Sequence, residues 1–404
     1  MFTAVFRETL KRTWRNRKNR LVLILSLLGI FAYLLLYLPG TEHPTTIDRE
    51  GLVLELSAEY GMKESRLQQG DIAVNSFTGT NTYSLAKENY ENYYTFDSAI
   101  DNGDIRLLVD LITSPRLMPP MAGDAERMNS DFGSDMHLAN YETAVMNTEL
   151  RAIAEEENLT LHLYDQKTAA QQLHLFLKTN GPLILLLVTI FVASEILVDD
   201  RKHRTLKAGQ PFGWWRYIFY QSISLFAILI TAFAVLLSLF YLVAGILYGF
   251  GSFGLGVSSY AYQEGYRGEV VNFSTRVIGS FVAMSVVFIL LLVYLFVRLN
   301  AWLSLLFRHD VVVMIIGFLI VGFNRIYSGG GEATIFGIGG QYFPQNYFEF
   351  GQVLSGERNF LALNNGFTFG TGVMVLAASI VILEVLLLLT VKWMNRQKFE
   401  REVG

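Results

Sequence analysis

Long apolar runs alternate with polar segments along this chain, and the runs have the length of membrane-crossing helices. An α-helix rises about 1.5 Å per residue against roughly 30 Å of hydrocarbon, so about 20 apolar residues cross a bilayer. The pattern therefore predicts an α-helical polytopic membrane protein. We expect six transmembrane helices over residues 21–40, 179–198, 216–248, 275–297, 311–327 and 371–391.

A different pattern precedes the first span. In residues 1–20, Phe2, Phe6, Leu10 and Trp14 recur every four residues, and basic side chains occupy the other faces. This spacing is typical of an amphipathic helix on a membrane surface, where each Lys or Arg near anionic lipid contributes about 1 kcal/mol. A mitochondrial presequence has a similar pattern, but a full span follows at once and ends without an A-x-A cleavage pattern. We therefore expect an uncleaved amphipathic helix on the cytoplasmic side.

The segment between the first two spans, residues 41–178, is polar and acidic and is long enough to fold as a domain. Three prolines between residues 114 and 123 indicate a loop there. The other patterns predict helices at Tyr83–Ile100 and Leu138–Asn158, a short strand at Leu159–Tyr164, and a helix at Gln166–Thr179 that runs into the second span. We expect a mostly helical (α or α+β) extracellular domain. Its acidic surface contributes to handling a substrate or partner, or serves solubility alone; for a cationic substrate, Glu155, Glu156 and Glu157 are the acids to neutralise.

Charge separates the remaining connections into two groups. Residues 1–20, the loop at 199–215, the turn at 298–310 and the tail at 392–404 are basic, and short basic segments are retained in the cytoplasm. The other group comprises residues 41–178, a Gly- and Tyr-rich loop at 249–274, and an apolar, Gly-rich segment at 328–370 that we expect to be external or to re-enter the membrane. Both termini are then cytoplasmic, and the expected location is the plasma membrane of a bacterium.

Composition agrees with a membrane protein and excludes several kinds of chemistry. Hydrophobic residues make up 52% of the 404 residues and charged residues 17%, against about a quarter charged in soluble domains. The net charge of −4 gives no indication of a nucleic-acid partner. The absence of cysteine excludes disulfides, thiol catalysis and Cys-ligated zinc.

Glycine motifs and histidines give no catalytic signature. Residues 249–254 match G-x-G-x-x-G but follow a membrane span rather than a strand, so they lack the frame of a dinucleotide site. The chain contains no Gly-Lys pair and hence no P-loop for ATP. Its six histidines lack metal-ligand spacing. We therefore expect neither an enzyme nor a bound metal or cofactor.

Four ionisable residues fall within or at the ends of predicted spans: Glu195, Arg298, Arg325 and Glu384. Such residues often mark a gate or a polar path through a membrane protein. The alternative is pairing between helices, or placement at the interface with long side chains reaching the head groups. We favour this alternative for Glu195 and the two arginines, and leave both roles open for Glu384.

The loop after the second span carries the most informative motif. The order Asp200-Arg201-Lys202-His203-Arg204-Thr205-Leu206, followed by Pro211, resembles the loop of type-2 ATP-binding-cassette transporter permeases. That family commonly has an acid, Arg, a second acid, any residue, Gly, Thr, Leu and then Pro, so Lys202 and Arg204 depart from the pattern. The re-entrant hairpin of the family, with its aromatic-Pro turn, is similar to Phe343, Pro344 and Tyr347 here.

This resemblance implies a permease without its own ATPase, in which a separate cassette subunit binds ATP and Mg and docks on the loop. The coupling residues would be Asp199, Asp200, Arg201, Arg204, Thr205, Leu206 and Pro211. A second permease copy or a homologue would complete the pathway. An amphipathic or hydrophobic substrate is expected, with an antimicrobial peptide as first candidate and a lipid-like molecule or drug as second.

Two other classes remain open. A secondary transporter should show an inverted repeat and an acid pair at mid-membrane, whereas the sequence shows one mid-span acid and no repeat. A membrane receptor, immunity or phage-adsorption protein would act through the external domain and need no docking loop. A cassette ATPase in the neighbouring reading frame would favour the permease.

Overall fold

A computed structural model describes residues 2–41, 47–68, 81–113, 136–195, 197, 213–264, 270–307, 309–327, 334–335 and 337–393. The protein is mostly helical, with two short antiparallel strand pairs among the described residues. These pairs are β1 (Gly256–Tyr260) with β2 (Phe273–Val277), and β3 (Thr334–Ile335) with β4 (Ile338–Gly339).

The longer helices are, in chain order, α1 (Phe2–Arg15), α2 (Arg17–Ala32), α3 (Arg49–Gln68), α4 (Thr82–Asn102), α5 (Ile105–Thr113), α7 (Met136–Ala154), α9 (Ala169–Lys178), α10 (Gly181–Ala193), α12 (Trp214–Tyr248), α13 (Ile278–Leu306), α14 (Asp310–Tyr327) and α17 (Phe369–Trp393). Short helices are α8 (Leu161–Tyr164), α15 (Phe350–Ser355) and α16 (Glu357–Ala362). A π-helix at Tyr33–Tyr37 and a 3-10 turn at Leu38–Gly40 extend α2.

Four described helical segments are long and apolar enough to cross a membrane: Arg17–Gly40, Trp214–Tyr248, Ile278–Leu306 and Phe369–Trp393. The pair Leu161–Lys178 and Gly181–Ala193 would make a fifth, but its two parts meet at an angle of 65°. In α14, the apolar part at Asp310–Gly322 is shorter. The protein is thus a multi-pass helical membrane protein by the length and composition of these helices.

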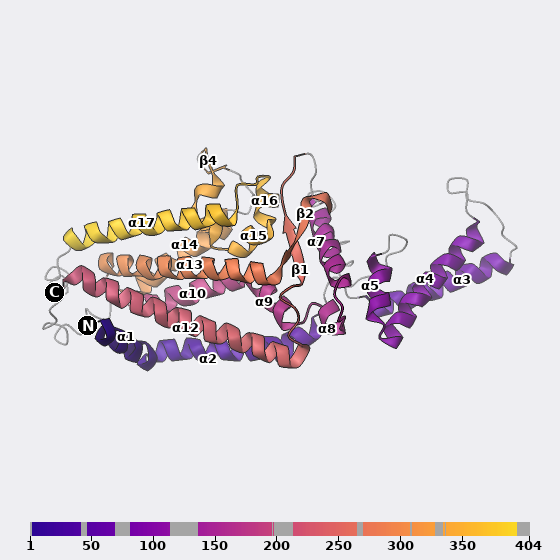
Figure 1. Cartoon of the computed structure of the whole chain (residues 1–404), viewed down its shortest axis with the longest axis horizontal. Helices are drawn as coiled ribbons and strands as arrows, with labels where there is room; N and C mark the ends of the chain where they lie inside the picture. The colour runs from indigo at the N-terminus through magenta and orange to yellow at the C-terminus, as the bar shows by residue number, and fades with distance from the viewer. Residues whose placement is uncertain are drawn as a thin grey trace.

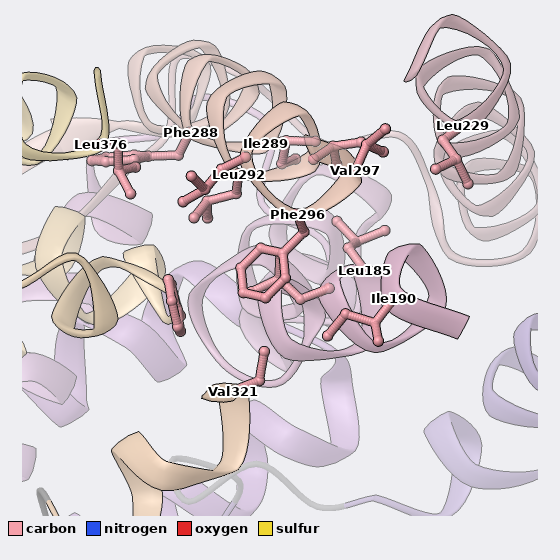
Figure 2. Close-up of a cluster of buried hydrophobic side chains, with 14 of the residues drawn as sticks. Leu185, Ile190, Leu229, Phe288, Ile289, Leu292, Phe296, Val297, Val321 and Leu376 are labelled. Atoms are coloured by element: carbon pink, nitrogen blue, oxygen red, sulfur yellow. The ribbon is translucent and has the colours of Figure 1, made fainter. Parts of the chain in front are cut away.

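Helices α10, α12, α13, α14 and α17 pack into a bundle, with α1 and α2 along one side (Figure 1). Its apolar core is centred on α13, whose Phe288, Leu292 and Phe296 are almost fully buried. Figure 2 shows these side chains facing Leu185 and Ile190 of α10, Val321 of α14 and Leu376 of α17. Helix α13 is therefore the central element of the bundle.

The two ends of the bundle differ in construction (Figure 1). At one end lie α1, the start of α12 and the last turns of α13 and α17. At the other end α7, α8 and the β1–β2 hairpin cover the bundle, and α3, α4 and α5 extend away from it. One apolar core joins these covering elements, since Leu52 of α3, Phe96 of α4, Leu150 of α7, Val257 of β1 and Ile278 of α13 belong to a single cluster.

Helix α1 does not pack on α12 along the whole apolar stripe of Phe2, Phe6, Leu10 and Trp14. Val5 and Thr9 are its buried residues, whereas Leu10 and Trp14 are exposed. Only the first part of the apolar stripe reaches α12, where Phe2 contacts Tyr220 edge-on at 5.8 Å between ring centroids. An amphipathic helix was predicted here, and the structure adds that its exposed face combines Leu10 and Trp14 with basic residues.

Three local predictions were wrong or need correction. The strand at Leu159–Tyr164 is a helical turn, α8, because the Thr160 side chain caps it by accepting a hydrogen bond from the Leu163 N–H at 3.2 Å. The helix at Gln166–Thr179 does not run straight into the second span. Pro182 opens α10 and lacks the N–H that would continue α9, so the chain bends after Lys178.

The third correction concerns the C-terminal turns of α13. Residues 298–310 were predicted as a cytoplasmic turn, but α13 continues through Arg298 to Leu306. Arg298 lies within this helix and pairs with Glu384 of α17. The loop at 249–274 also contains structure that was not predicted, the β1–β2 hairpin.

Candidate functional site

An ion pair with a buried guanidinium joins two of the candidate spans. Arg298 of α13 is 1% exposed, and its guanidinium meets the carboxylate of Glu384 on α17 in a two-pronged contact. The Nε atom donates to Oε1 of Glu384 at 2.5 Å, and the Tyr294 hydroxyl donates to the same oxygen at 2.9 Å. Glu384 therefore accepts hydrogen bonds from two residues one helical turn apart on α13.

A third helix completes this network. Arg298 Nη1 donates to the Ser222 hydroxyl of α12 at 3.1 Å, and the guanidinium lies 5.5 Å from the ring centroid of Phe219. Removing a charged group from water is costly, so a buried pair persists only when the remaining donors are satisfied. The pair here has that support from α12, which means that α12, α13 and α17 are held together through one guanidinium.

The contact surface between α13 and α17 has a polar stripe. Tyr294, Arg298 and Trp302 are spaced four residues apart, which places them on one face of α13. The indole N–H of Trp302 donates to the Thr390 hydroxyl at 3.1 Å, beyond the Glu384 contact. The spacing of these residues at i, i+4 and i+8 within an apolar run could have predicted the polar stripe. This spacing was not used in the sequence analysis.

Glu195 lies at the end of α10, where α1 and α2 meet. The Lys18 ammonium is 3.3 Å from its carboxylate, and Asn16 donates a short hydrogen bond to it. Lys18 also donates to Ser194 at 3.2 Å and lies 4.3 Å from the ring centroid of Phe191. A small crevice borders this ion pair, lined among others by Thr9, Arg12, Asn19, Gln221, Val192 and Leu225. Glu195 thus fastens the N-terminal helices to α10, immediately before residues 199–212.

The far end of the bundle holds a second polar cluster, centred on the partly buried Glu149, which sequence reasoning missed. Glu149 of α7 accepts hydrogen bonds from Gln166 at 3.1 Å and from Ser258 of β1 at 3.0 Å. Burial alone would raise its pKa, but Lys178, His174 and these two hydrogen bonds hold the pKa of Glu149 below its ordinary value. Nothing in the sequence separates Glu149 from the many other acids of this region.

Lys178 also influences a carboxyl on the other side of α9. Burial raises the pKa of Glu357 on α16, and the Lys178 ammonium opposes that shift. Lys178 lies at the bend between α9 and α10, so one cation is shared electrostatically by α7 and α16 at the point where the broken span turns.

Phe343, Pro344 and Tyr347 lie in a compact turn. Pro344 begins a 3-10 turn that ends at Tyr347, whose side chain is fully buried, and the Tyr347 hydroxyl donates to the Gln341 carbonyl at 2.7 Å. The Tyr347 ring is nearly parallel to that of Phe288, with 6.3 Å between centroids. This turn therefore packs its aromatic residue on α13, and α15 and α16 follow it.

The other predicted site residues are not brought together by the described structure. Asp199, Asp200, Arg201, Arg204, Thr205, Leu206 and Pro211 lie outside the described residues. Arg325 is in α14, but its side chain is also outside the described part. Within the described ranges, no group of three or more His, Asp or Glu side chains is placed to hold a metal ion.

Comparison of the chain with protein-family models, with curated proteins and with solved structures finds no match. Function must therefore be argued from the geometry and from the resemblance in the loop at 199–215.

Proposed function

We propose that this chain is the membrane-spanning permease subunit of an ATP-driven exporter of the ATP-binding-cassette class. A separate ATPase subunit would bind ATP and Mg, and a second permease copy or a homologue would complete the pathway. The chain itself would carry out no catalysis. The substrate would be amphipathic or hydrophobic, with an antimicrobial peptide as the first candidate.

The observation that carries this proposal is the construction of the bundle end that flanks residues 199–212. Helix α10 ends there and α12 begins there, and α1 is packed on α12 and fastened to α10 through Lys18 and Glu195. A push on the loop would therefore be shared by α1, α10 and α12 rather than absorbed by one helix end. This sharing supports the proposal that an ATPase subunit docks on the loop.

The Arg298–Glu384 network gives such a push a route to the rest of the bundle. Arg298 contacts Ser222 of α12 and Glu384 of α17, so a displacement of α12 bears on both α13 and α17. We propose that this network is a structural coupling between the loop-bearing helix and the central helices, and not a binding site for the substrate.

The membrane topology belongs to the same proposal. We propose six spans, with α10 preceded by the bent α9 as the second and α14 as the fifth, and an external region formed mainly by residues 41–178. Both termini and residues 199–215 would then face the cytoplasm of a bacterial cell. The basic residues of α1, at the bundle end opposite the acidic helices α3 and α4, support this orientation.

Charge reversal in the loop tests the assignment. The double variant Asp200→Lys, Arg201→Glu, co-expressed with the candidate cassette ATPase, should insert normally but lose most ATPase co-purification and substrate-stimulated hydrolysis. The matched control reverses an ion pair elsewhere, Lys167→Asp with Asp165→Lys between α8 and α9, whose charged atoms lie 3.6 Å apart. Equal coupling in both double variants would contradict docking on this loop.

A further inference from the structure

The α3–α4 hairpin extends away from the bundle and exposes large apolar side chains (Figure 1). On α3, Leu54 is 69% exposed and Tyr60 49%, and on α4 Tyr94 is 55% exposed. Other exposed apolar residues of the hairpin are Val53, Met62, Leu67 and Leu85. Exposed apolar surface concentrated on one projecting element marks an interaction site more often than a solvated face.

Three aromatic rings form a ladder across the two helices. Tyr60 and Tyr90 have ring centroids 5.6 Å apart, and Tyr90 and Tyr94 have centroids 6.1 Å apart. We call Tyr60, Tyr90 and Tyr94 the tyrosine ladder. The Lys63 ammonium lies 4.3 Å from the Tyr90 centroid and 4.8 Å from that of Tyr60. The ladder thus already holds one cation of the chain itself against two ring faces, as expected from the charge distribution of aromatic rings.

The hairpin is also acidic. Helices α3 and α4 together contain eight acidic and four basic residues. Two of the basic residues are engaged within the hairpin, Arg49 with Asp101 and Lys87 with Glu91. By helical spacing, Glu64 lies one turn beyond Tyr60, and Asp97 lies one turn beyond Tyr94. Negative charge therefore flanks the tyrosine ladder along both helices.

We propose that the α3–α4 hairpin binds a cationic amphipathic peptide along the tyrosine ladder. The apolar side chains of the peptide would lie against the ladder, and its Lys and Arg side chains would meet the acids of α3 and α4. This complementarity of charge selects a cationic peptide over an anionic one, and exposed apolar surface selects an amphipathic peptide over a simple cation. At about 1.5 Å per residue, the 20 residues of α3 give about 30 Å of surface, which suits a peptide of similar length.

This inference rests on the proposed function only in naming the bound peptide as the exported substrate, because binding itself needs no ATPase. If the peptide binds the ladder while loop charge reversal leaves ATPase coupling intact, the binding surface stands and the exporter assignment falls. If coupling is lost in the loop variant but the peptide does not bind, only the present inference fails.

The test uses the full-length protein in nanodiscs of zwitterionic phosphatidylcholine, with empty nanodiscs as reference. The probe is a fluorescein-labelled 18-residue amphipathic peptide of leucine and lysine, and the comparison probe replaces lysine by glutamate. We expect the lysine peptide to bind with an affinity that falls as salt rises, and the glutamate peptide to bind at the level of empty nanodiscs. Screening acts over about 8–10 Å at ordinary ionic strength, which gives this salt dependence.

Variants locate the binding surface. The double variant Tyr60→Ala, Tyr94→Ala should weaken binding of the lysine peptide roughly tenfold, because exposed aromatic anchors carry much of such an interface. Glu64→Gln with Asp97→Asn should reduce the salt dependence. Lys63→Ala should strengthen binding, since it removes the ammonium that competes for the rings. A merely structural role for Lys63 would instead leave binding unchanged or weaken it.

The matched control is Tyr342→Ala, which removes a ring that is 62% exposed but lies outside the hairpin. Every variant is first checked for an unchanged thermal unfolding midpoint. Equal binding by the ladder and Tyr342 variants, equal binding of the two peptides, or concentration-dependent self-association of the hairpin without peptide binding would each overturn the proposal.

Discussion

At the scale of single residues, the Arg298–Glu384 pair places two ionisable side chains inside an apolar bundle. Both partners are inside candidate spans, and each would be costly alone. Ser222 and Tyr294 supply additional hydrogen bonds to the two partners. The Glu195–Lys18 pair, at the bundle end, is partly exposed and depends less on such support.

Glu384→Ala should lower the stability by about 3–5 kcal/mol, because the buried Arg298 guanidinium is left without its partner. Arg298→Ala should cost less, because the Glu384 side chain is 23% exposed. The double variant Arg298→Leu, Glu384→Leu should recover much of the thermal unfolding midpoint, since no charge remains. Unfolding in detergent measures this, with Thr390→Ala as a control that removes only neutral hydrogen bonds, to Trp302 and to the Leu386 carbonyl, at about 1 kcal/mol each. A double variant that is as unstable as the single ones would contradict this account of the pair.

The sequence predicts such sites unevenly at this scale. It identifies Arg298 and Glu384 as unusual because each interrupts an apolar run. Such an interruption can be recognised from the neighbouring residues in the sequence alone. It does not pair them, because they are 86 positions apart and their meeting depends on the packing of α13 against α17. Glu149 goes unnoticed for the opposite reason, since its neighbours in sequence are also polar and only the fold buries it.

At the scale of elements, the bend between α9 and α10 is held from outside. Gly351 of α15 lies so close to the end of α9 that a Cβ atom there would be 2.2 Å from the Lys178 carbonyl oxygen. The backbone of α15 therefore rests directly on the last turn of α9. The sequence pattern predicted helices on both sides of the bend. It did not predict the contact between Gly351 and the end of α9, because these residues are far apart in the chain.

Gly351→Ala should force α15 away from α9 and lower stability by about 1–3 kcal/mol, the usual range for overpacking. The matched control is Gly29→Ala in α2, where a Cβ atom would meet nothing within 4 Å. This control should be neutral or slightly stabilising, because alanine favours helix more than glycine does. Thermal unfolding of both variants gives the comparison, and equal midpoints would show that α15 does not brace the bend.

At the scale of the whole molecule, the two ends of the bundle carry different chemistry. Basic α1 lies at one end, and the acidic α3–α4 hairpin projects from the other (Figure 1). The long apolar helices were predictable from sequence because the bilayer imposes their length, as α12 and α17 illustrate. The covering layer was predictable only as helices, since β1, α7 and α16 come together through contacts between distant segments.

The proposed sidedness can be measured directly. The chain has no cysteine, so Ser57→Cys on α3, Thr3→Cys on α1 and His203→Cys in the loop each give one reactive thiol. In intact cells an impermeant thiol reagent should label the Ser57→Cys protein alone, and all three should be labelled after the membrane is permeabilised. Labelling of the Thr3→Cys or His203→Cys protein in intact cells would reverse the proposed orientation.

The shared apolar core of the covering layer has a consequence for how this protein can diversify. Leu52 and Phe96 anchor the base of the α3–α4 hairpin in that core, with Tyr93 packed against it, whereas Leu54, Tyr60 and Leu85 farther out are exposed. A graft that replaces only this outer part of the hairpin leaves the anchors in place, while excision of all of residues 41–178 removes α7 and with it the Tyr141 contact to Tyr260 and Phe360. Interchange of hairpin tips between related chains would therefore alter recognition without rebuilding the bundle.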